Sequence, residues 1–313
     1  MKFRILHAVF IFLGGILLSS PGYANKGEGY RCLIRYGDGF LAAGSGGQID
    51  WISVSGEKTK SEKFPGENFN CLLEYNNLVI AAGERGTILI SSNNGIFRKV
   101  ESGTVRNINS LTVFNGIIIA GVDQGEIITG DGRGSFKKNH LSLKGNIVSV
   151  SARASECFGV TDEGEIIRSL DGSKWEITDF NKVYAGYYKP CYFTAILVTE
   201  NRIAVTGIRN DGSPVMLFSN MGGVWTERIL NYTDDQGIKG YLSDIPKAIS
   251  YYEQGDEYYI ACSKGKLMKL PSCSQCNKLA VFSEEDLEGI SIIENNLMIV
   301  GGNFFNRALN LGI

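Results

Sequence analysis

A hairpin phrase recurs seven times along this chain, and its periodicity limits the possible folds more than any other feature. Each copy is 13 residues long and joins two apolar runs through a turn pair such as Asn76-Asn77 or Asn115-Gly116. Asn and Gly tolerate the positive φ angles of tight hairpin turns. The copies span residues 32–44, 71–83, 109–121, 147–159, 195–207, 250–262 and 289–301. Such a spacing is typical of repeat architectures.

Each unit continues with a short loop that ends in glycine and then a third apolar run, and several units add a fourth run. Four short antiparallel strands per repeat predict an all-β chain folded as a seven-bladed β-propeller, with about 38–55 residues per blade. A β-sandwich would not produce seven equal hairpins, and no segment keeps the apolar period of about 3.6 residues that a helical solenoid needs. The seventh unit shows only a third run, ALNLGI, so we expect its blade to be three-stranded.

The composition agrees with a fold rich in turns. Glycine supplies 39 of 313 residues and proline only 6, which favours many tight turns over a collagen-like or low-complexity chain. The formal net charge of −2 provides no basic field for a phosphate backbone, so we expect no nucleic-acid partner.

The first 24 residues have the pattern of a signal peptide. Lys2 and Arg4 precede an apolar stretch at 8–18, and Gly22-Tyr23-Ala24 forms a small-residue cleavage site. The alternative is an uncleaved anchor, but the apolar stretch is much shorter than the ~20 residues needed to span a bilayer. We therefore expect residues 25–313 to form a single propeller domain, periplasmic or secreted, with no transmembrane span.

A second motif follows the third run in four of the units. The segments SSNNGIF (91–97), TGDGRGSF (129–136), SLDGSKW (169–175) and SNMGGVW (219–225) share a small polar start, a central glycine and a final aromatic residue. An Asp or Asn side chain can accept backbone N–H bonds across such a turn, while the glycine takes a left-handed conformation and the aromatic ring packs between sheets. The acidic position holds Asn93, Asp131 and Asp171, whereas Met221 departs from the pattern.

These turns resemble the Asp-box, or BNR, repeat. The chain is similar to the propeller superfamily that contains sialidase-like enzymes and the photosystem II stability/assembly factor-like exported propellers. The phrase VIAAGERGTILISSNNGIF (79–97) resembles the second group more. This resemblance implies an exported propeller whose Asp-box turns are structural and lie on the face away from the usual ligand site.

The loops between second and third strands supply the first candidate binding residues. In a propeller these loops reach the face where ligands usually bind, and here they carry a mixture of charges that suits polar protein or peptide contacts. The alternative is a solvated rim without a partner. The candidates are Glu84, Arg85, Asp123, Asp162, Glu163, Arg209 and Asp211.

Two long connections interrupt the repeat, at residues 181–193 and 231–247, and both are rich in tyrosine. Insertions between regular blades form loops, and exposed tyrosines are favoured in recognition surfaces. The alternative is that the rings only pack the longer loops. The candidates are Tyr184, Tyr187, Tyr188, Tyr192, Tyr232 and Tyr241.

The seven cysteines suggest one local disulfide and no metal site. Cys273 and Cys276 lie where other units carry the Asp-box-like turn, and we interpret the pair as a disulfide that replaces it. A zinc site would need a second ligand pair, and His140 is the only histidine after the leader. We expect neither a metal nor a cofactor.

The residues that a sialidase-like enzyme would need are not evident in the sequence. A sialidase-like glycosidase needs an arginine cluster, a tyrosine nucleophile with a glutamate, and an acid/base aspartate. The Arg-Ile-Pro signature of that family is absent, and GYRCLIRYGDG (29–39) stands in its place. We therefore predict a non-catalytic exported propeller that binds or helps assemble proteins of the cell envelope. The alternative is a carbohydrate-acting enzyme or a glycan-binding propeller.

Overall fold

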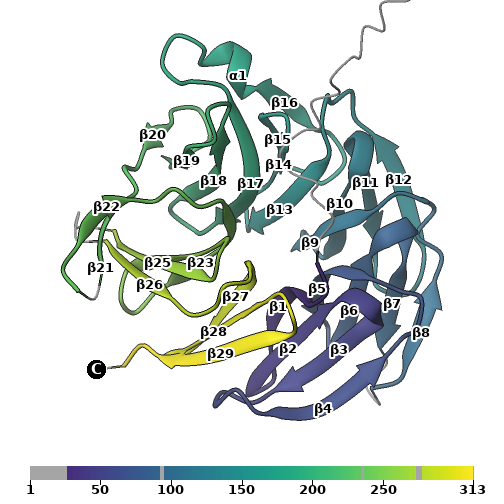
Figure 1. Cartoon of the computed structure of the whole chain (residues 1–313). Helices are drawn as coiled ribbons and strands as arrows, with labels where there is room; N and C mark the ends of the chain where they lie inside the picture. The colour runs from purple at the N-terminus through teal and green to yellow at the C-terminus, as the bar shows by residue number, and fades with distance from the viewer. Residues whose placement is uncertain (1–26, 92–94, 235, 273–276, 313) are drawn as a thin grey trace, which may run out of the picture.

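Seven small antiparallel sheets form a ring around a central channel in the computed structural model (Figure 1). The structure describes residues 27–91, 95–234, 236–272 and 277–312. It confirms the predicted seven-bladed β-propeller. The predicted signal peptide, Asn93 and the Cys273–Cys276 pair lie outside the described residues.

The chain forms the blades in order, and the first strand of each blade lines the channel. Blades 1 and 2 contain β1 (Tyr30–Tyr36), β2 (Gly39–Gly44), β3 (Gln48–Ile52), β4 (Lys58–Lys63), β5 (Phe69–Tyr75), β6 (Leu78–Gly83), β7 (Ile88–Ser91) and β8 (Phe97–Val100). Blades 3 and 4 contain β9 (Ile108–Phe114), β10 (Ile117–Val122), β11 (Glu126–Gly130), β12 (Phe136–His140), β13 (Ile147–Arg153), β14 (Glu156–Thr161), β15 (Glu165–Ser169) and β16 (Glu176–Asp179).

The remaining three blades are less regular. Blade 5 contains β17 (Cys191–Val198), β18 (Ile203–Arg209), β19 (Pro214–Ser219) and β20 (Thr226–Glu227), and it follows the short helix α1 (Phe180–Val183). Blade 6 contains β23 (Pro246–Tyr252), β24 (Glu257–Cys262), β25 (Lys266–Pro271) and β26 (Lys278–Val281), with β21 (Asn231–Asp234) and β22 (Lys239–Tyr241) added at its outer edge. Blade 7 contains β27 (Leu287–Ile293), β28 (Asn296–Gly301) and β29 (Phe305–Asn310).

The second strand of each blade is buried on both faces, which explains its continuous apolar sequence. β2, β6 and β14 are buried at nearly every position because a neighbouring sheet covers each side. Several of these strands end in glycine where the start of the first strand crosses them. A Cβ at Gly44 or Gly83 would collide with the backbone of that strand. Small residues therefore mark the closest approach of the two strands.

The sixth hairpin differs from the prediction. The pairing of Ala248 with Ala261 and of Tyr252 with Glu257 starts the inner strand before residue 250 and leaves a four-residue turn. Four residues also separate the last paired positions of the fifth hairpin, Val198 and Ile203, whereas two residues separate Tyr36 and Gly39 in the first. The prediction of seven equal hairpins was therefore wrong for blades 5 and 6.

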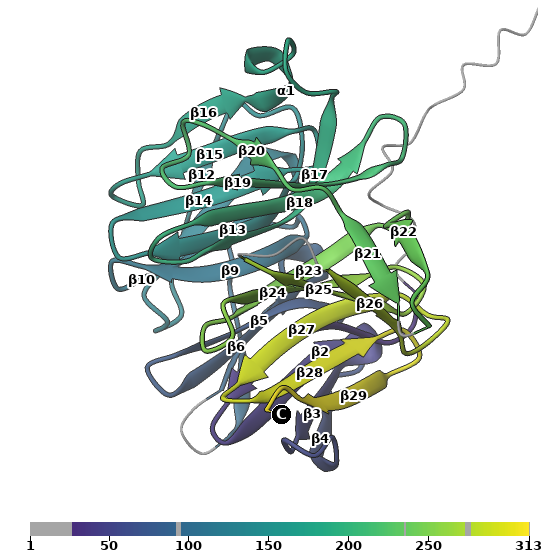
Figure 2. The ribbon, with the colours of Figure 1, turned by 90° about the vertical axis from the view of Figure 1, so that its left-hand side faces the viewer.

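Both long connections first run along the outside of the ring and then return to it at the inner strands β17 and β23 (Figures 1 and 2). Helix α1 occupies the periphery between blades 4 and 5. Strands β21 and β22 widen blade 6, with β21 running parallel to β26. Within the described ranges, no helix has the length and apolar character needed to cross a membrane.

The ring closes between blades 7 and 1 by packing of one blade against the other. The inner strands β1 and β27 contact each other, and Gly29 forms an isolated antiparallel bridge with Gly302. The Asn303 amide donates to the Glu28 carbonyl at 2.7 Å, and the Tyr30 and Phe304 rings meet edge to face at 5.2 Å. Among the described strands, none from blade 1 joins the sheet of blade 7, whose three described strands agree with the expected three-stranded blade.

The turns after the third strands have the geometry expected from their residues. Gly132, Gly172 and Gly222 adopt positive φ angles near 77°. The Asp171 carboxylate accepts the amides of Ser173 and Lys174, each at 2.8 Å. The aromatic side chains that follow pack against the preceding blade: for example, Trp225 of blade 5 is buried with Phe158 of blade 4.

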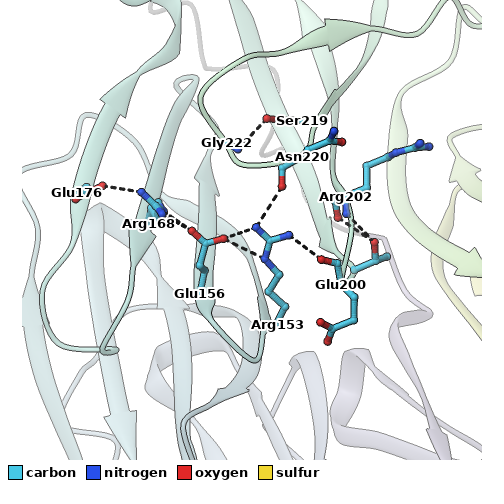
Figure 3. Close-up of polar contacts among 10 residues, drawn as sticks. Arg153, Glu156, Arg168, Glu176, Glu200, Arg202, Ser219, Asn220 and Gly222 are labelled. Atoms are coloured by element: carbon cyan, nitrogen blue, oxygen red, sulfur yellow. Dashed lines mark hydrogen bonds and ion pairs between the residues drawn. The ribbon is translucent and has the colours of Figure 1, made fainter.

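A buried carboxylate joins blades 4 and 5 at the face that carries these turns (Figure 3). Glu156 lies between two arginines: Nε of Arg153 is 3.0 Å and Nε of Arg168 is 2.8 Å from its carboxylate oxygens. Arg153 also donates to the backbone carbonyls of Glu200 and Asn220 in blade 5. Burial alone would raise the pKa of Glu156, but the two guanidinium groups lower it below its usual range.

Replacing this carboxylate should destabilise the ring. We expect Glu156→Gln to lower the free energy of unfolding by about 2–3 kcal/mol, because it leaves two guanidinium groups without their shared anion. The matched control is Glu176→Gln, whose carboxylate is exposed and 3.4 Å from Arg168, and which should change stability by less than about 0.5 kcal/mol. Urea titration at neutral pH measures both.

The contribution of Glu156 also has a defined pH dependence. Since its pKa is lower in the folded state, its stabilisation is complete above its unfolded pKa and is lost as the pH falls through the folded value. The difference between wild type and Glu156→Gln should therefore shrink on acidification below about pH 4. A difference that stays constant down to pH 2 would show that ionisation of Glu156 does not stabilise the fold.

Candidate functional site

The central channel contains a cavity of about 320 Å³ that is bordered by residues of all seven inner strands. This volume is at the lower end of the range for small-molecule sites. At the end of the channel where the first strands of the blades begin, seven side chains line the cavity, one from the same position in each blade. This end of the channel and the loops around it are here called the loop face.

Each of these seven positions is a β-bulge. The register between the first and second strands skips one residue near the start of every inner strand, so that residue has no partner in the ladder. A bulge redirects a side chain, and all seven bulged residues line the cavity. We call this set the bulge ring: Arg31, Asn70, Asn109, Val148, Thr194, Lys247 and Glu288.

The charges of the bulge ring are paired within the protein. Arg31 contacts Glu84 at 2.7 Å, and Lys247 lies 3.2 Å from Glu288 and 3.1 Å from Asp286. Burial alone would lower the pKa of Lys247, but the carboxylates of Glu288 and Asp286 raise it. The mouth of the channel therefore offers polar groups and balanced charges.

The asparagines of the bulge ring connect neighbouring blades. Asn70 accepts a bond from Arg31 at 3.2 Å and donates to the carbonyl of Ile108, at the start of the next inner strand. Asn109 donates to the carbonyl of Ile147 in the same way. No sequence pattern predicts this ring, because its members differ in chemistry and only their position in the repeat relates them.

A second repeated contact explains the predicted acidic residues of the rim. The residue before three inner strands is asparagine: Asn68, Asn107 and Asn146. Each side-chain oxygen accepts the amide of the second loop residue of the preceding blade, and each side-chain amide donates to a carboxylate in the loop of its own blade. We call this contact the asparagine latch. It binds the carboxylates of Glu84, Asp123 and Asp162.

The other predicted rim residues differ in accessibility. Arg85 is exposed and has a positive φ of 54°. Glu163 is half-buried, and burial together with the nearby carboxylates of Asp162 and Glu165 raises its pKa. Arg209 pairs with Glu227 at 2.5 Å. Asp211 is exposed, and its bonds to Lys189 and Ser213 lower its pKa.

The predicted tyrosines do not form one cluster. Tyr184 and Tyr188 pack on Phe180 and donate to backbone carbonyls in the turn between β19 and β20, at 2.6 and 2.7 Å. Both rings therefore contribute to the fold of the first connection. Tyr187 is 83% exposed.

The other three tyrosines lie apart from these. Tyr192 is half-buried and lines the central cavity. Tyr232 and Tyr241 lie on β21 and β22, at the outer edge of blade 6, and Tyr241 is exposed. The structure thus brings Tyr192 to the channel and separates it from the pair in blade 6.

The comparisons with known proteins agree with the architecture. No protein-family model matches the chain, and no curated protein matches it significantly. The WD40 β-propeller domain of Doa1 has a TM-score of 0.68 with 12% identity, over 90% of this chain and 92% of that domain. The computationally designed Ika8 protein has a TM-score of 0.62 with 12% identity, over 93% and 98% of the two chains. At this identity, the likeness shows the β-propeller fold alone.

The asparagine latch can be tested at Asn146. Its side chain bonds Gln124 at 2.9 Å and Asp162 at 2.8 Å. We expect Asn146→Ala to lower the free energy of unfolding by about 2 kcal/mol, because a buried carboxylate loses a donor. The control Asn139→Ala removes an exposed asparagine of β12 and should be nearly neutral. Equal effects of the two variants would contradict the latch.

Asn146→Asp gives a second test, with a defined sign. It places a carboxylate against Asp162, whose pKa burial already raises, so repulsion should destabilise the protein at neutral pH. The loss should diminish as the pH falls below about 5, because protonation removes the repulsion. The loss caused by Asn146→Ala should not recover. Thermal unfolding at several pH values distinguishes the two variants.

Proposed function

We propose that this chain is an exported, non-catalytic β-propeller that binds or helps assemble other proteins through its loop face. The observation that carries the proposal is the bulge ring, which turns seven side chains toward one end of the channel. Paired charges and amides at that end suit the backbone and polar side chains of a polypeptide better than a strongly charged ligand. The leader-like residues 1–24 support export to the periplasm or beyond.

The resemblance of the turns after the third strands to Asp-boxes also supports the proposal of a non-catalytic exported propeller. Asp171 accepts backbone amides within its own turn, which is a structural role. We therefore propose that the chain is related to the photosystem II stability/assembly factor-like exported propellers, in which the Asp-box turns are structural.

The exposed charges of the loop face allow a direct test. Arg85 and Lys264 are exposed second residues of their loops. We expect the double variant Arg85→Glu, Lys264→Glu to lose the partner that wild type retains in a crosslinked pull-down from the native host, read by mass spectrometry. The matched control is Lys137→Glu, Lys174→Glu, which makes the same charge change at exposed residues away from the loop face. Equal loss in both variants, or no enriched protein with wild type, would contradict the proposal.

Glu163 supports a second candidate function. A half-buried carboxyl with a raised pKa beside two other carboxylates is a possible general acid, as glycoside hydrolysis requires. The alternative is therefore a carbohydrate-acting enzyme or a glycan-binding propeller. Hydrolysis of a glycoside panel that Glu163→Gln abolishes would favour the enzyme, and binding on a glycan array without hydrolysis would favour the glycan-binding protein.

A further inference from the structure

The sheet of blade 7 has an open outer edge. In each of the other six blades a fourth strand pairs with the third. In blade 7 the third strand, β29, pairs with β28, and no described strand lies on its other side (Figure 1). This edge is therefore one strand closer to the channel than the edges of the complete blades.

The backbone of β29 presents unpaired groups along that edge. The amide of Leu311, just after β29, donates to the carbonyl of Asn295 in the turn before β28, at 2.6 Å. Because the groups of a strand alternate in direction, the amides and carbonyls of Asn306, Ala308 and Asn310 point away from β28. Three residues are thus available to pair with an added strand.

The edge also carries fewer charges than the outer strands of most other blades. The outer strands β4, β8 and β12 each carry two or three lysines or arginines, and β21 covers the edge of β26. Native proteins use such charges to prevent the addition of foreign strands. β16 has two acidic residues and β20 is only two residues long, whereas β29 is six residues long and carries only Arg307. Among the described outer strands with a single charge, β29 therefore offers the longest edge.

A fourth strand of blade 7 that belonged to this chain would have to connect to β1. The path that such connections take in the other blades is blocked here. In blades 1, 2 and 6 the connection from the fourth strand crosses the third loop residue so closely that a Cβ at Gly47, Gly86 or Gly265 would collide with it. The equivalent residue in blade 7 is Phe304, whose ring packs on Tyr30. A connection from a fourth strand of this chain would meet that side chain. This favours a separate polypeptide over a fourth strand connected along that route as the occupant.

The surroundings of β29 indicate the chemistry of the occupant. In four blades an aromatic residue at or just before the fourth strand packs on the preceding blade: Phe97, Phe136, Trp175 and Trp225. On the corresponding side of blade 7, Phe305, Leu309 and Leu311 are only half-buried against blade 6. Arg307 alternates onto the same side. An aromatic side chain would cover the apolar residues, and a carboxylate would pair with Arg307.

We propose that the outer edge of β29 binds an extended segment of a partner protein, antiparallel to β29, with an aromatic residue facing blade 6 and an acidic residue near Arg307. The segment completes blade 7 as its fourth strand. This surface is separate from the loop face, so either can fail without the other.

A peptide from the chain itself provides the probe. Residues 173–180, SKWEITDF, contain the aromatic residue and the fourth strand of blade 4, and strand alternation puts Trp175 and the acidic Asp179 on the same face. We expect this peptide, labelled with a fluorophore, to bind the purified protein in an anisotropy titration, and a peptide of scrambled order to bind at least about tenfold more weakly. Equal affinities of the two peptides would overturn the proposal.

Substitutions at Ala308 locate the binding. Ala308→Pro removes one outward amide and should weaken peptide binding about tenfold or more, whereas Ala308→Val keeps the amide and should bind as wild type. Equal binding by both variants would place the peptide elsewhere. Sedimentation tests the competing occupant: a dimer of wild type that Ala308→Pro abolishes would show that a second copy covers the edge, and would overturn the proposal.

Hydrogen exchange tests the proposal without any substitution. In the free protein, the amides of Asn306, Ala308 and Asn310 should exchange rapidly, while that of Leu309 is protected by its bond to β28. Saturation with the peptide should slow the first three and leave Leu309 unchanged. Protection of Leu309 alone, or of none of the four, would contradict strand addition.

Discussion

Each blade buries both faces of its sheet only because another blade lies on either side, and every other feature of the ring depends on this mutual packing. The clusters of buried residues cross from blade to blade: Ile80 and Ile90 of blade 2 pack with Ile118 and Ile128 of blade 3. Removing one blade would expose two sheet faces at once. The closing contact between blades 7 and 1 therefore stabilises the ring mainly by keeping two sheet faces buried, and its few polar bonds are a small part of that effect.

That closing contact differs from the others in kind. Where three neighbouring blades use an asparagine latch, blade 1 has Gly29, and the Glu28 carbonyl accepts the Asn303 amide instead. Blade 7 uses Asp286 in the latch position toward blade 6, where Lys247 compensates its charge. Different acceptors thus bind the amide of the second loop residue and hold it against the next blade: an asparagine side chain, an aspartate side chain or a backbone carbonyl.

Much of the architecture could be predicted from the sequence, because strand alternation, small residues at close approaches and turn pairs leave local signals. The bulge ring could not, since Arg31, Val148 and Glu288 have nothing in common except their position. The asparagine latch leaves a signal in the regular spacing of Asn68, Asn107 and Asn146. These residues precede the hairpins, so the hairpin pattern does not include them. The roles of Tyr184 and Tyr188 depend on contacts with β19 and β20, distant in sequence, and no local pattern reveals them.

The loops between second and third strands have one further consequence. Gly46, Arg85, Gln124, Lys264 and Asn303 are all second loop residues with φ near 55°. In each, the backbone amide is bonded to the following blade. At Gln124 the side chain is exposed and makes no polar contact among the described residues, whereas Arg85 donates to the Gly66 carbonyl and Lys264 lies 3.5 Å from the buried Asp244. The loops of blades 1, 2, 3, 6 and 7 thus share one main-chain conformation, so residues grafted at their second positions would sit in equivalent places around the ring without redesign of the core.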